Sequence, residues 1–344
     1  MAQYNFGAGG LYVNGIPMNA GAGLLGGLGC GNIYYLVTAK ATATNLYYKR
    51  LVENGVKGSD ICTTLAAAYA KTTANQNDVI VVTPGAYLET AELAWSKGNT
   101  HLVGLGGPNT GGDWSEPGVV IYTTGVGVAS VITVTGANCQ FYNFTVSNYG
   151  ANAACLTAFT LNKYGCYFKN VTFQGMMTTG PDATVAAAAL YIDGDGMYPI
   201  FDCCTIGQNV WDTRTGALSG VLRFTNTAGT GPQNGKFRNC DFLSCSETAT
   251  CAMVAIPINY AIGRGWKFDN CHFENFSVNW AVNLNQVFYD NCGTTHSIML
   301  HHCTAIGIDE WQDADQGNNY IGADMPIVGL GGGLARNPTA VVGT

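Results

Sequence analysis

The sequence predicts an all-β solenoid, in which short strands stack coil upon coil. A four-residue phrase, which reads aromatic, any residue, Asn or Cys, apolar, recurs between residues 141 and 303. A second phrase with the alternating pattern of a β-strand precedes several copies, and turn residues separate the two. One such unit is too small to bury its inward face, whereas stacked units bury a continuous core. The 344-residue chain is 47% hydrophobic, which is enough apolar material for that core.

The first segment, residues 1–58, is rich in Gly, Ala, Asn and Tyr and has no clear core periodicity before residue 32. This composition predicts an arm that docks on another molecule. Next, Ser59 or Asp60 is a suitable cap for a helix from Ile61 to Thr72. A helix in this place would cover the open first coil of the solenoid.

Strands are predicted after the helix. A continuous apolar run at 79–82 is followed by the turn Pro84-Gly85 and by further apolar runs at 101–105 and 119–122. The recurring phrase then takes over. Its copies are residues 141–144, 168–171, 201–204, 237–240, 268–271 and 289–292, with a degenerate copy at 300–303. Because the spacing between copies varies, the strands repeat while the loops differ in length.

Asn and Cys occupy the end of the phrase. Identical residues on stacked coils lie about 4.8 Å apart, so Asn side chains can bond to the copies above and below, while Cys fills the interior. The predicted Asn ladder is Asn143, Asn170, Asn239, Asn270 and Asn291, and the predicted Cys stack is Cys204, Cys240, Cys271, Cys292 and Cys303. We expect buried filler, because a reactive thiol needs exposure and a basic neighbour. The sequence leaves open whether an exposed thiol, such as Cys30 or Cys62, links subunits.

The run from Gly58 through the predicted helix to residues 77–87, followed by 101–106, resembles the opening of right-handed parallel β-helix proteins of the pectin-lyase-like superfold. The later coils resemble the rungs of that superfold. The resemblance covers residues 59–303 and implies a right-handed parallel β-helix with an N-terminal capping helix. It leaves 1–58 as an N-terminal arm and 304–344 as a C-terminal cap or tail. Lyases, hydrolases, adhesins and virus spikes share this architecture, so it does not select a function.

Charge and apolar patterning exclude several partners. The net charge of −7, from 15 Lys and Arg against 22 Asp and Glu, lacks the basic footprint of a nucleic-acid-binding protein. The apolar runs are far shorter than the about 20 residues of a membrane span, and the start does not read as a signal peptide. We therefore expect no nucleic acid or membrane partner, and assembly in a cytoplasm.

Metal-binding patterns are weak. The 13 Cys include no CxxC pair, and the clustered His296, His301 and His302 have no recognised metal spacing. On an ordinary strand, His301 and His302 would point to opposite faces. The sequence therefore predicts no metal site and no cofactor.

Charged residues directly precede the ladder position in five coils. They are Asp202, Asp269 and Asp290, with Lys169 and Arg238 at the equivalent place in two others. With the coils in register, they would form an outward row along one face. This row, together with Trp311, is the candidate glycan groove; the alternative is the polar outside of strands whose inside is Phe and Cys. The paired Asp, Gly-His-Gly and Arg-x-Lys signature of polygalacturonases is absent, so no catalytic residue is assigned.

Two other acidic groups and a few aromatic residues complete the candidates. The stretch 309–315 is acidic, and Asp193 and Asp195 lie in a turn without the closing Glu of an EF-hand loop. Tyr142, Trp211 and Trp280 could stack on sugars, although packing is the more frequent role of such residues.

Four observations favour a structural role: no export signal, few charges, no catalytic signature, and flanking segments suited to docking. In these respects the chain resembles β-helical spike and decoration proteins of tailed phages. We therefore expect a non-enzymatic virion protein, either a capsid decoration protein or a head or tail spike, that forms a homotrimer and docks on other virion proteins through its arms. The alternatives are a polysaccharide lyase or glycoside hydrolase, such as a tailspike depolymerase, and a non-catalytic adhesin that binds a surface glycan during host-cell attachment.

Overall fold

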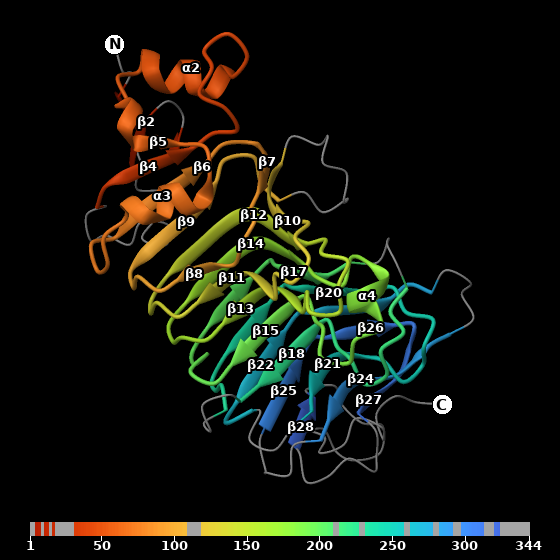
Figure 1. The fold of residues 1–344 in the computed structure, drawn as a ribbon. Coiled ribbons are helices and arrows are strands. Elements are labelled where there is room, and N and C mark those ends of the chain that lie inside the picture. The colour runs from red at the N-terminus through yellow and green to blue at the C-terminus, as the bar shows by residue number, and fades with distance from the viewer. Residues whose placement is uncertain are drawn as a thin grey trace.

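The computed structural model describes residues 31–108, 118–208, 213–226, 231–257, 262–277, 282–291 and 297–312, together with the strands at 4–7, 10–13, 16–17 and 320–323. Almost all of the regular structure is parallel β-strand. The strands stack into three columns that wind around one core, and the coils advance from the N-terminal tip to the C-terminal end (Figure 1).

Each coil passes through the three columns in turn. Column one contains β5 (Ile61–Cys62), β4 (Ile33–Leu36), β6 (Asp78–Val82), β9 (Thr100–Gly104), the first halves of β12 (Gln140–Asn148) and β14 (Tyr167–Gln174), β16 (Ile200–Asp202), β19 (Lys236–Arg238), β22 (Trp266–Asp269), β25 (Ser297–His301) and β28 (Tyr320–Ala323). Column two contains β7 (Gly85–Leu88), β10 (Val119–Thr123), the second halves of β12 and β14, β17 (Thr205–Gly207), β20 (Asp241–Ser244), β23 (His272–Asn275) and β26 (Thr304–Ile306).

Column three is a separate sheet of eight strands. It contains β8 (Leu93–Trp95), β11 (Ser130–Val134), β13 (Thr157–Leu161), β15 (Leu190–Asp193), β18 (Leu222–Thr225), β21 (Ala252–Ile256), β24 (Leu284–Asp290) and β27 (Ile308–Gln312). The alternating phrases of the sequence form its middle strands. This arrangement is a right-handed parallel β-helix, and the predicted fold class is therefore confirmed.

A column of stacked rings fills the core beneath column one. The first residue of the recurring phrase is a fully buried Phe on successive coils, namely Phe141, Phe168, Phe201, Phe237 and Phe268. Neighbouring rings are nearly parallel, with interplanar angles of 7–12° and centroids 4.5–5.0 Å apart. Because parallel strands keep strict register, one aromatic position per coil produces a continuous stack.

The capping helix is shorter than predicted. Residues 61–62 form β5, which pairs with β4, and helix α3 spans Leu65–Lys71. Its cap is Thr64, whose Oγ1 accepts a hydrogen bond from the Ala67 N–H, so the expectation of a cap at Ser59 or Asp60 was wrong. The helix places Leu65, Ala68 and Tyr69 in the core, and Lys97 Nζ donates to three carbonyls at its C-terminal end.

The columns extend beyond residues 59–303. Strand β4 lies within the expected N-terminal arm and pairs with β6, while β26 and β27 follow residue 303. The remaining elements are the antiparallel strands β1 (Tyr4–Gly7), β2 (Gly10–Val13) and β3 (Ile16–Pro17), helices α2 (Leu46–Glu53) and α4 (Thr179–Asp182), and a 3-10 turn at Gly58–Asp60. None of the helices that the structure describes is both long and apolar enough to cross a bilayer.

Candidate functional site

From β12 onward, each described coil turns from column one to column two at one residue with a left-handed backbone conformation. These corner residues are Asn143, Asn170, Cys203, Asn239, Asn270 and His302, and all have positive φ, between 51° and 59°. Asn tolerates this left-handed conformation better than most residues, which explains its recurrence. Asn170 Nδ2 donates to Asn143 Oδ1 at 3.1 Å and Asn270 Nδ2 donates to Asn239 Oδ1 at 2.9 Å. Cys203 separates these two pairs, so the ladder has two parts.

The last predicted member of the ladder lies elsewhere. Asn291 follows β24 in column three, where its N–H donates to the Ile256 carbonyl. The corner after Asn270 is instead His302, from the degenerate copy at 300–303. The phrase at 289–292 therefore matches the repeat in its residue types and not in its place in the coil.

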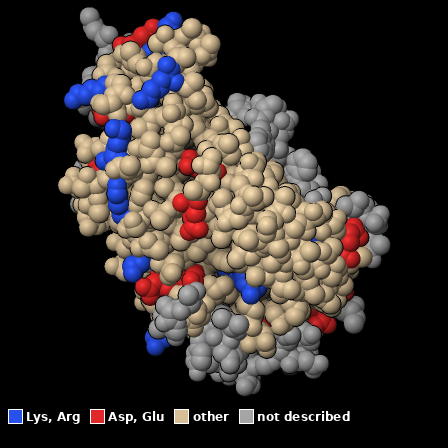
Figure 2. Space-filling model, in the orientation of Figure 1, with Lys and Arg blue, Asp and Glu red and all other residues tan. Residues whose placement is uncertain are grey.

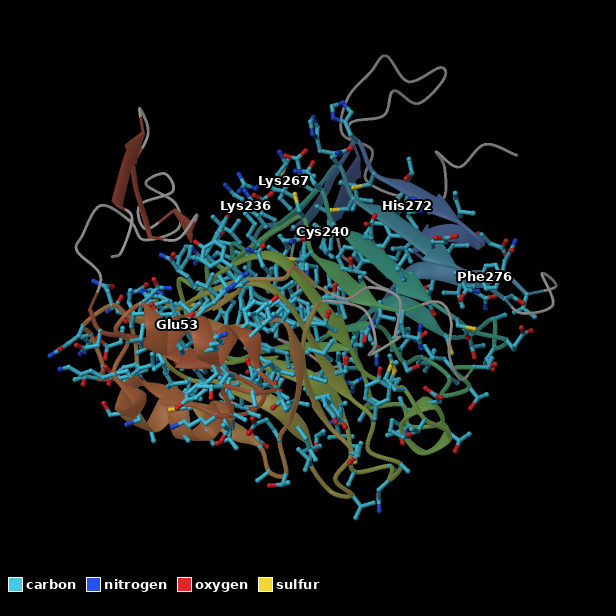
Figure 3. All side chains as sticks on the ribbon, turned by 90° about the horizontal axis from the view of Figure 1, so that it is seen from above. Glu53, Lys236, Cys240, Lys267, His272 and Phe276 are labelled. Atoms are coloured by element: carbon cyan, nitrogen blue, oxygen red, sulfur yellow. The ribbon has the colours of Figure 1, made fainter. Side chains whose placement is uncertain are left out.

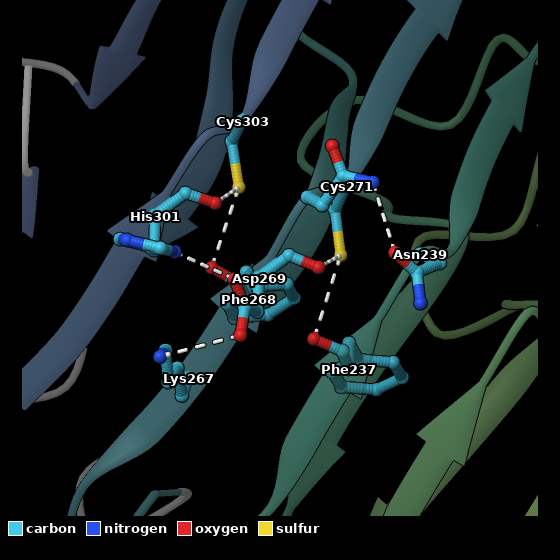
Figure 4. Close-up of polar contacts among 9 residues, drawn as sticks. Phe237, Asn239, Lys267, Phe268, Asp269, Cys271, His301 and Cys303 are labelled. Carbon is cyan, nitrogen blue, oxygen red and sulfur yellow. Dashed lines mark hydrogen bonds and ion pairs between the residues drawn. The ribbon is translucent and has the colours of Figure 1, made fainter.

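At the last four of these corners, the residue that follows the corner is a Cys. Cys204, Cys240, Cys271 and Cys303 are buried on successive coils, and Cys292 lies outside the described residues. Each Sγ is close to main-chain carbonyls at the corner, as for Cys271 with Phe237 O and Asp269 O, both at 3.6 Å (Figure 4). Burial raises the pKa of Cys240, and the hydrogen bond from the neighbouring thiol raises the pKa of Cys303. These groups therefore stay protonated and are poor nucleophiles.

One described cysteine is exposed, and it is not one of those named from the sequence. Cys203 occupies a corner and faces solvent, whereas Cys62 is buried beside helix α3. Cys30 lies outside the described residues.

The residue before each of these corners points away from the stack of Phe rings, and all of them reach solvent except the first, Tyr142, which is buried. We call Tyr142, Lys169, Asp202, Arg238, Asp269 and His301 the outer row, because they are register partners on successive strands of column one. A second outward pair, Lys236 and Lys267, lies beside it, and the two lysines are neighbours at the edge of the molecule (Figure 3). The face shown in Figure 2 is mostly uncharged, and its Lys and Arg gather at the N-terminal tip and along one edge.

The carboxylates of the outer row have basic or hydroxyl partners. Asp202 Oδ2 lies 3.6 Å from Arg238 Nη2 and accepts a hydrogen bond of 3.1 Å from the Tyr167 hydroxyl. Asp269 Oδ1 lies 2.6 Å from His301 Nδ1, and Oδ2 lies 3.3 Å from Lys267 Nζ (Figure 4).

These contacts determine what the row can do chemically. The hydrogen bond with His301 and the charge of Lys267 lower the pKa of Asp269. A general acid needs a carboxyl group whose pKa is raised, so the environment of Asp269 is opposite to that requirement. Asp202 and Asp269 are also two coils apart, with Arg238 between them.

Asp290 and Trp311 do not join the outer row. Asp290 ends β24 in column three, where it is buried and in register with Ile256. Trp311 lies on β27 with its ring packed edge-on against Phe273, at a centroid distance of 5.8 Å. The sequence predicts both residues in the glycan groove, and the structure brings neither to the surface of column one.

The remaining candidates are scattered. Asp195 pairs with Lys163 at 3.1 Å, and Asp309 accepts a hydrogen bond from Asn283 Nδ2 at 2.7 Å. Tyr142 is buried. Trp211, Trp280, His296 and residues 313–315 lie outside the described residues.

The sequence reasoning missed one cluster. Asp269, His301 and His302 come together at the last corner, and the rings of the two histidines have centroids 3.9 Å apart. The expectation that the two histidines point to opposite faces was wrong, because the left-handed corner at His302 breaks the alternation of a strand. Alignment of His302 with Asn270 was the signal that could have shown it.

Comparisons with known proteins give the fold. No protein-family model matches the chain, and no curated protein matches it. Among solved structures, pectate lyase Pel9A superposes with a TM-score of 0.53 at 12% identity, over 86% of this chain and 76% of that one. A pectin methylesterase mutant in complex with a hexasaccharide superposes with a TM-score of 0.50 at 15% identity, over 84% and 87%.

A looser neighbour is ORF18 of Geobacillus virus E2, with a TM-score of 0.40, 14% identity, and coverage of 93% of this chain and 67% of that one. A likeness at that level carries no argument. The two better superpositions agree with the columns described above, and the chain shares the right-handed parallel β-helix fold of pectate lyase and pectin methylesterase.

Proposed function

We propose that the chain is a non-enzymatic structural protein of a tailed-phage virion, a capsid decoration protein or a head or tail spike, that attaches to the particle through its N-terminal segment. The observation that carries this proposal is helix α2, which lies at the tip of the solenoid (Figure 1).

Helix α2 leaves apolar side chains in solvent. Asn45 caps it by accepting a hydrogen bond of 2.9 Å from the Tyr48 N–H, yet none of its eight residues is buried. Leu46 is 55% exposed and Val52 is 41% exposed. Apolar residues grouped on an exposed element are typical of a surface that another molecule covers. Because α2 falls within residues 1–58, this supports docking through the segment that composition already marked as an arm.

The solenoid supplies a stem suited to this role. Its buried rings and thiols form one continuous, close-packed core. The solenoid is therefore a stiff stem that transmits force from its tip and holds the tip in a fixed position. The carboxylates of the outer row have cationic or hydroxyl partners, and their environment favours a stable surface over acid–base chemistry. We further propose a homotrimer, assembled in the host cytoplasm, with other virion proteins as partners.

The test is an inventory of particles that co-purify with the chain. We expect mass spectrometry to find the chain in fixed stoichiometry with capsid or tail proteins, and cryo-electron microscopy to find it in symmetric copies. Replacing Leu46 and Val52 together by Asp should remove it from the particles while its circular dichroism stays unchanged. The matched control is Val126→Asp, because Val126 is 76% exposed and lies outside α2. A chain that is monomeric and absent from particles would overturn the proposal.

A second candidate is an enzyme or adhesin for polysaccharides. It is favoured by the charged outer row on column one and by the fold shared with a pectin methylesterase whose structure holds a hexasaccharide. The check is release of new reducing ends from bacterial surface polysaccharides, with the double variant Asp202→Asn, Asp269→Asn as the control. Under the structural proposal, neither protein releases any; release that the double variant loses would establish the enzyme.

A further inference from the structure

The cluster at the last described corner joins consecutive coils. Asp269 ends β22, and its register partner His301 ends β25 on the next coil. His302 is the corner residue that follows. One carboxylate oxygen and one ring nitrogen from each histidine all lie within 4.8 Å of one another, and no other such group of three occurs among the described residues.

The corner geometry makes this juxtaposition possible. At Asn143, Asn170, Asn239 and Asn270 the left-handed corner carries an amide that bonds to its neighbour along the ladder. At His302 the same conformation, with φ of 51°, carries an imidazole instead. The ladder's amide is therefore replaced by an imidazole at a corner whose preceding residue, His301, already contacts a carboxylate.

The donor set selects a class of cation. Two imidazole nitrogens and one carboxylate oxygen are ligands typical of Zn²⁺ and of neighbouring first-row divalent ions, whereas Ca²⁺ needs six or more oxygens. Ligand bonds of about 2.0–2.2 Å place donors of a tetrahedral ion about 3.3 Å apart. His301 Nδ1 lies 2.6 Å from Asp269 Oδ1, and one ligand atom from each of the three residues lies within 4.8 Å of the other two, so the group is compact enough for one ion.

We propose that Asp269, His301 and His302 bind one first-row divalent transition-metal ion, with Zn²⁺ as the representative. The cation replaces the proton shared by Asp269 Oδ1 and His301, and Lys267 keeps its contact with the other oxygen, Oδ2. The site leaves a fourth position for water or an outside ligand. Because its ligands come from two coils, the ion fastens the coil that contains β25 to the coil before it, which contains β22.

The test uses the full chain without an affinity tag, stripped with EDTA and titrated with Zn²⁺ against a chromophoric chelator. We expect one ion per chain with a dissociation constant on the order of 1 µM. Co²⁺ should give the intense visible absorption of a tetrahedral site, and a millimolar excess of Ca²⁺ should not displace either ion. Zn²⁺ should also raise the melting temperature.

Two substitutions separate metal binding from folding. His302→Asn places the ladder's own residue at the left-handed corner, so the fold is kept while the imidazole is lost. Together with Asp269→Asn, it should weaken Zn²⁺ binding at least tenfold. The matched control is His272→Ala, which removes a histidine on β23 that bonds to Thr304 and lies outside the group. Its affinity should equal that of the parent chain.

The Lys267→Gln variant tests whether Asp269 is a metal ligand, because a carboxylate with only a structural role would leave the affinity for Zn²⁺ unchanged. Removing a positive charge 3.3 Å from Asp269 Oδ2 should tighten Zn²⁺ binding several-fold. No binding by the parent chain at 100-fold the expected constant, or equal binding by the parent and the His302→Asn chain, would overturn the proposal. An unchanged affinity in Lys267→Gln would remove Asp269 from the ligand set and overturn the three-ligand form.

Discussion

The two sides of column one differ although they share the same strands. On the inside, one residue type repeats from coil to coil, and the rings of Phe168, Phe201 and Phe237 stack almost in parallel. One residue further along the chain, on the outside, Lys169, Asp202 and Arg238 alternate in charge. In the close-packed core, any change of side-chain volume is destabilising, so one residue type is kept from coil to coil. Positions that face solvent tolerate many residue types. The fold is therefore encoded inside, and what is specific to this protein must be sought outside.

The first prediction concerns the core side of column one. Phe201→Ala should lower the free energy of unfolding by about 3–5 kcal/mol, because it removes a ring packed between two others and leaves a cavity. Urea denaturation followed by circular dichroism measures this. The matched control is Asp202→Asn, one residue away on the outer side, which should change stability by less than about 1 kcal/mol. Equal losses in the two variants would show that the two sides are not distinct.

The second prediction concerns the coils where the outer side is also buried. On β9, His101 lies on the outer side of the strand, yet it is only 5% exposed. Burial lowers the pKa of His101 to about 4 from an ordinary 6.5. Between these values the unfolded chain binds the proton more readily than the folded one, so stability is lost as pH falls from about 6.5 to about 4. The loss should approach about 3 kcal/mol.

His101→Gln should remove that part of the pH dependence while leaving stability at pH 7 within about 1–2 kcal/mol of the parent, because Gln retains a donor for Asn77. Urea denaturation at several pH values compares the two proteins, and other titrating groups cancel in the difference. An identical pH dependence in the variant would mean that His101 is accessible to solvent and that the outer side is open along its whole length.

The third prediction sharpens the comparison at the corner, which belongs to neither side. Cys203→Asn should stabilise the protein by about 1 kcal/mol, because Asn is less strained at φ of 53° and can bond to Asn170 and Asn239. Cys203→Ala removes the thiol without supplying the amide, so it should give no gain. Thermal unfolding of both variants measures the difference, and a gain in the Ala variant would assign the effect to the thiol instead.

The sequence predicts the repeating interior well, because burial leaves a periodic record of residue types. The prediction fails where a segment has the residue types of the phrase without the spacing of a full coil. Asn291 comes 21 residues after Asn270, too few for three strands and their turns, whereas His302 comes 32 residues after it, within the 27 to 36 of the earlier coils. The length of a coil is thus a stronger criterion than the phrase. Asp290 was misplaced for the same reason, since β24 belongs to column three, and Trp311 also lies on a strand of that column.

The candidate site was harder to predict, because it depends on backbone conformation. Strand alternation separates His301 from His302, and only the left-handed corner brings their rings together. The contact of Asp269 with His301 likewise needs the register of two strands, β22 and β25, which no local pattern gives.

The smallest predicted effect tests whether the outer row contributes to the fold at all. The Arg238 side chain is 42% exposed and its Nη2 lies 3.6 Å from Asp202 Oδ2, so a double-mutant cycle with Arg238→Gln and Asp202→Asn should give a coupling energy of about 0.2–1 kcal/mol that decreases with added salt. Urea denaturation of the four proteins measures it. A coupling energy above about 2 kcal/mol would mean that the alternating charges hold the coils together. The residue types at these positions would then be explained by stability. A value within the expected range leaves these positions free to vary for binding, which is the condition under which a function can reside on this side.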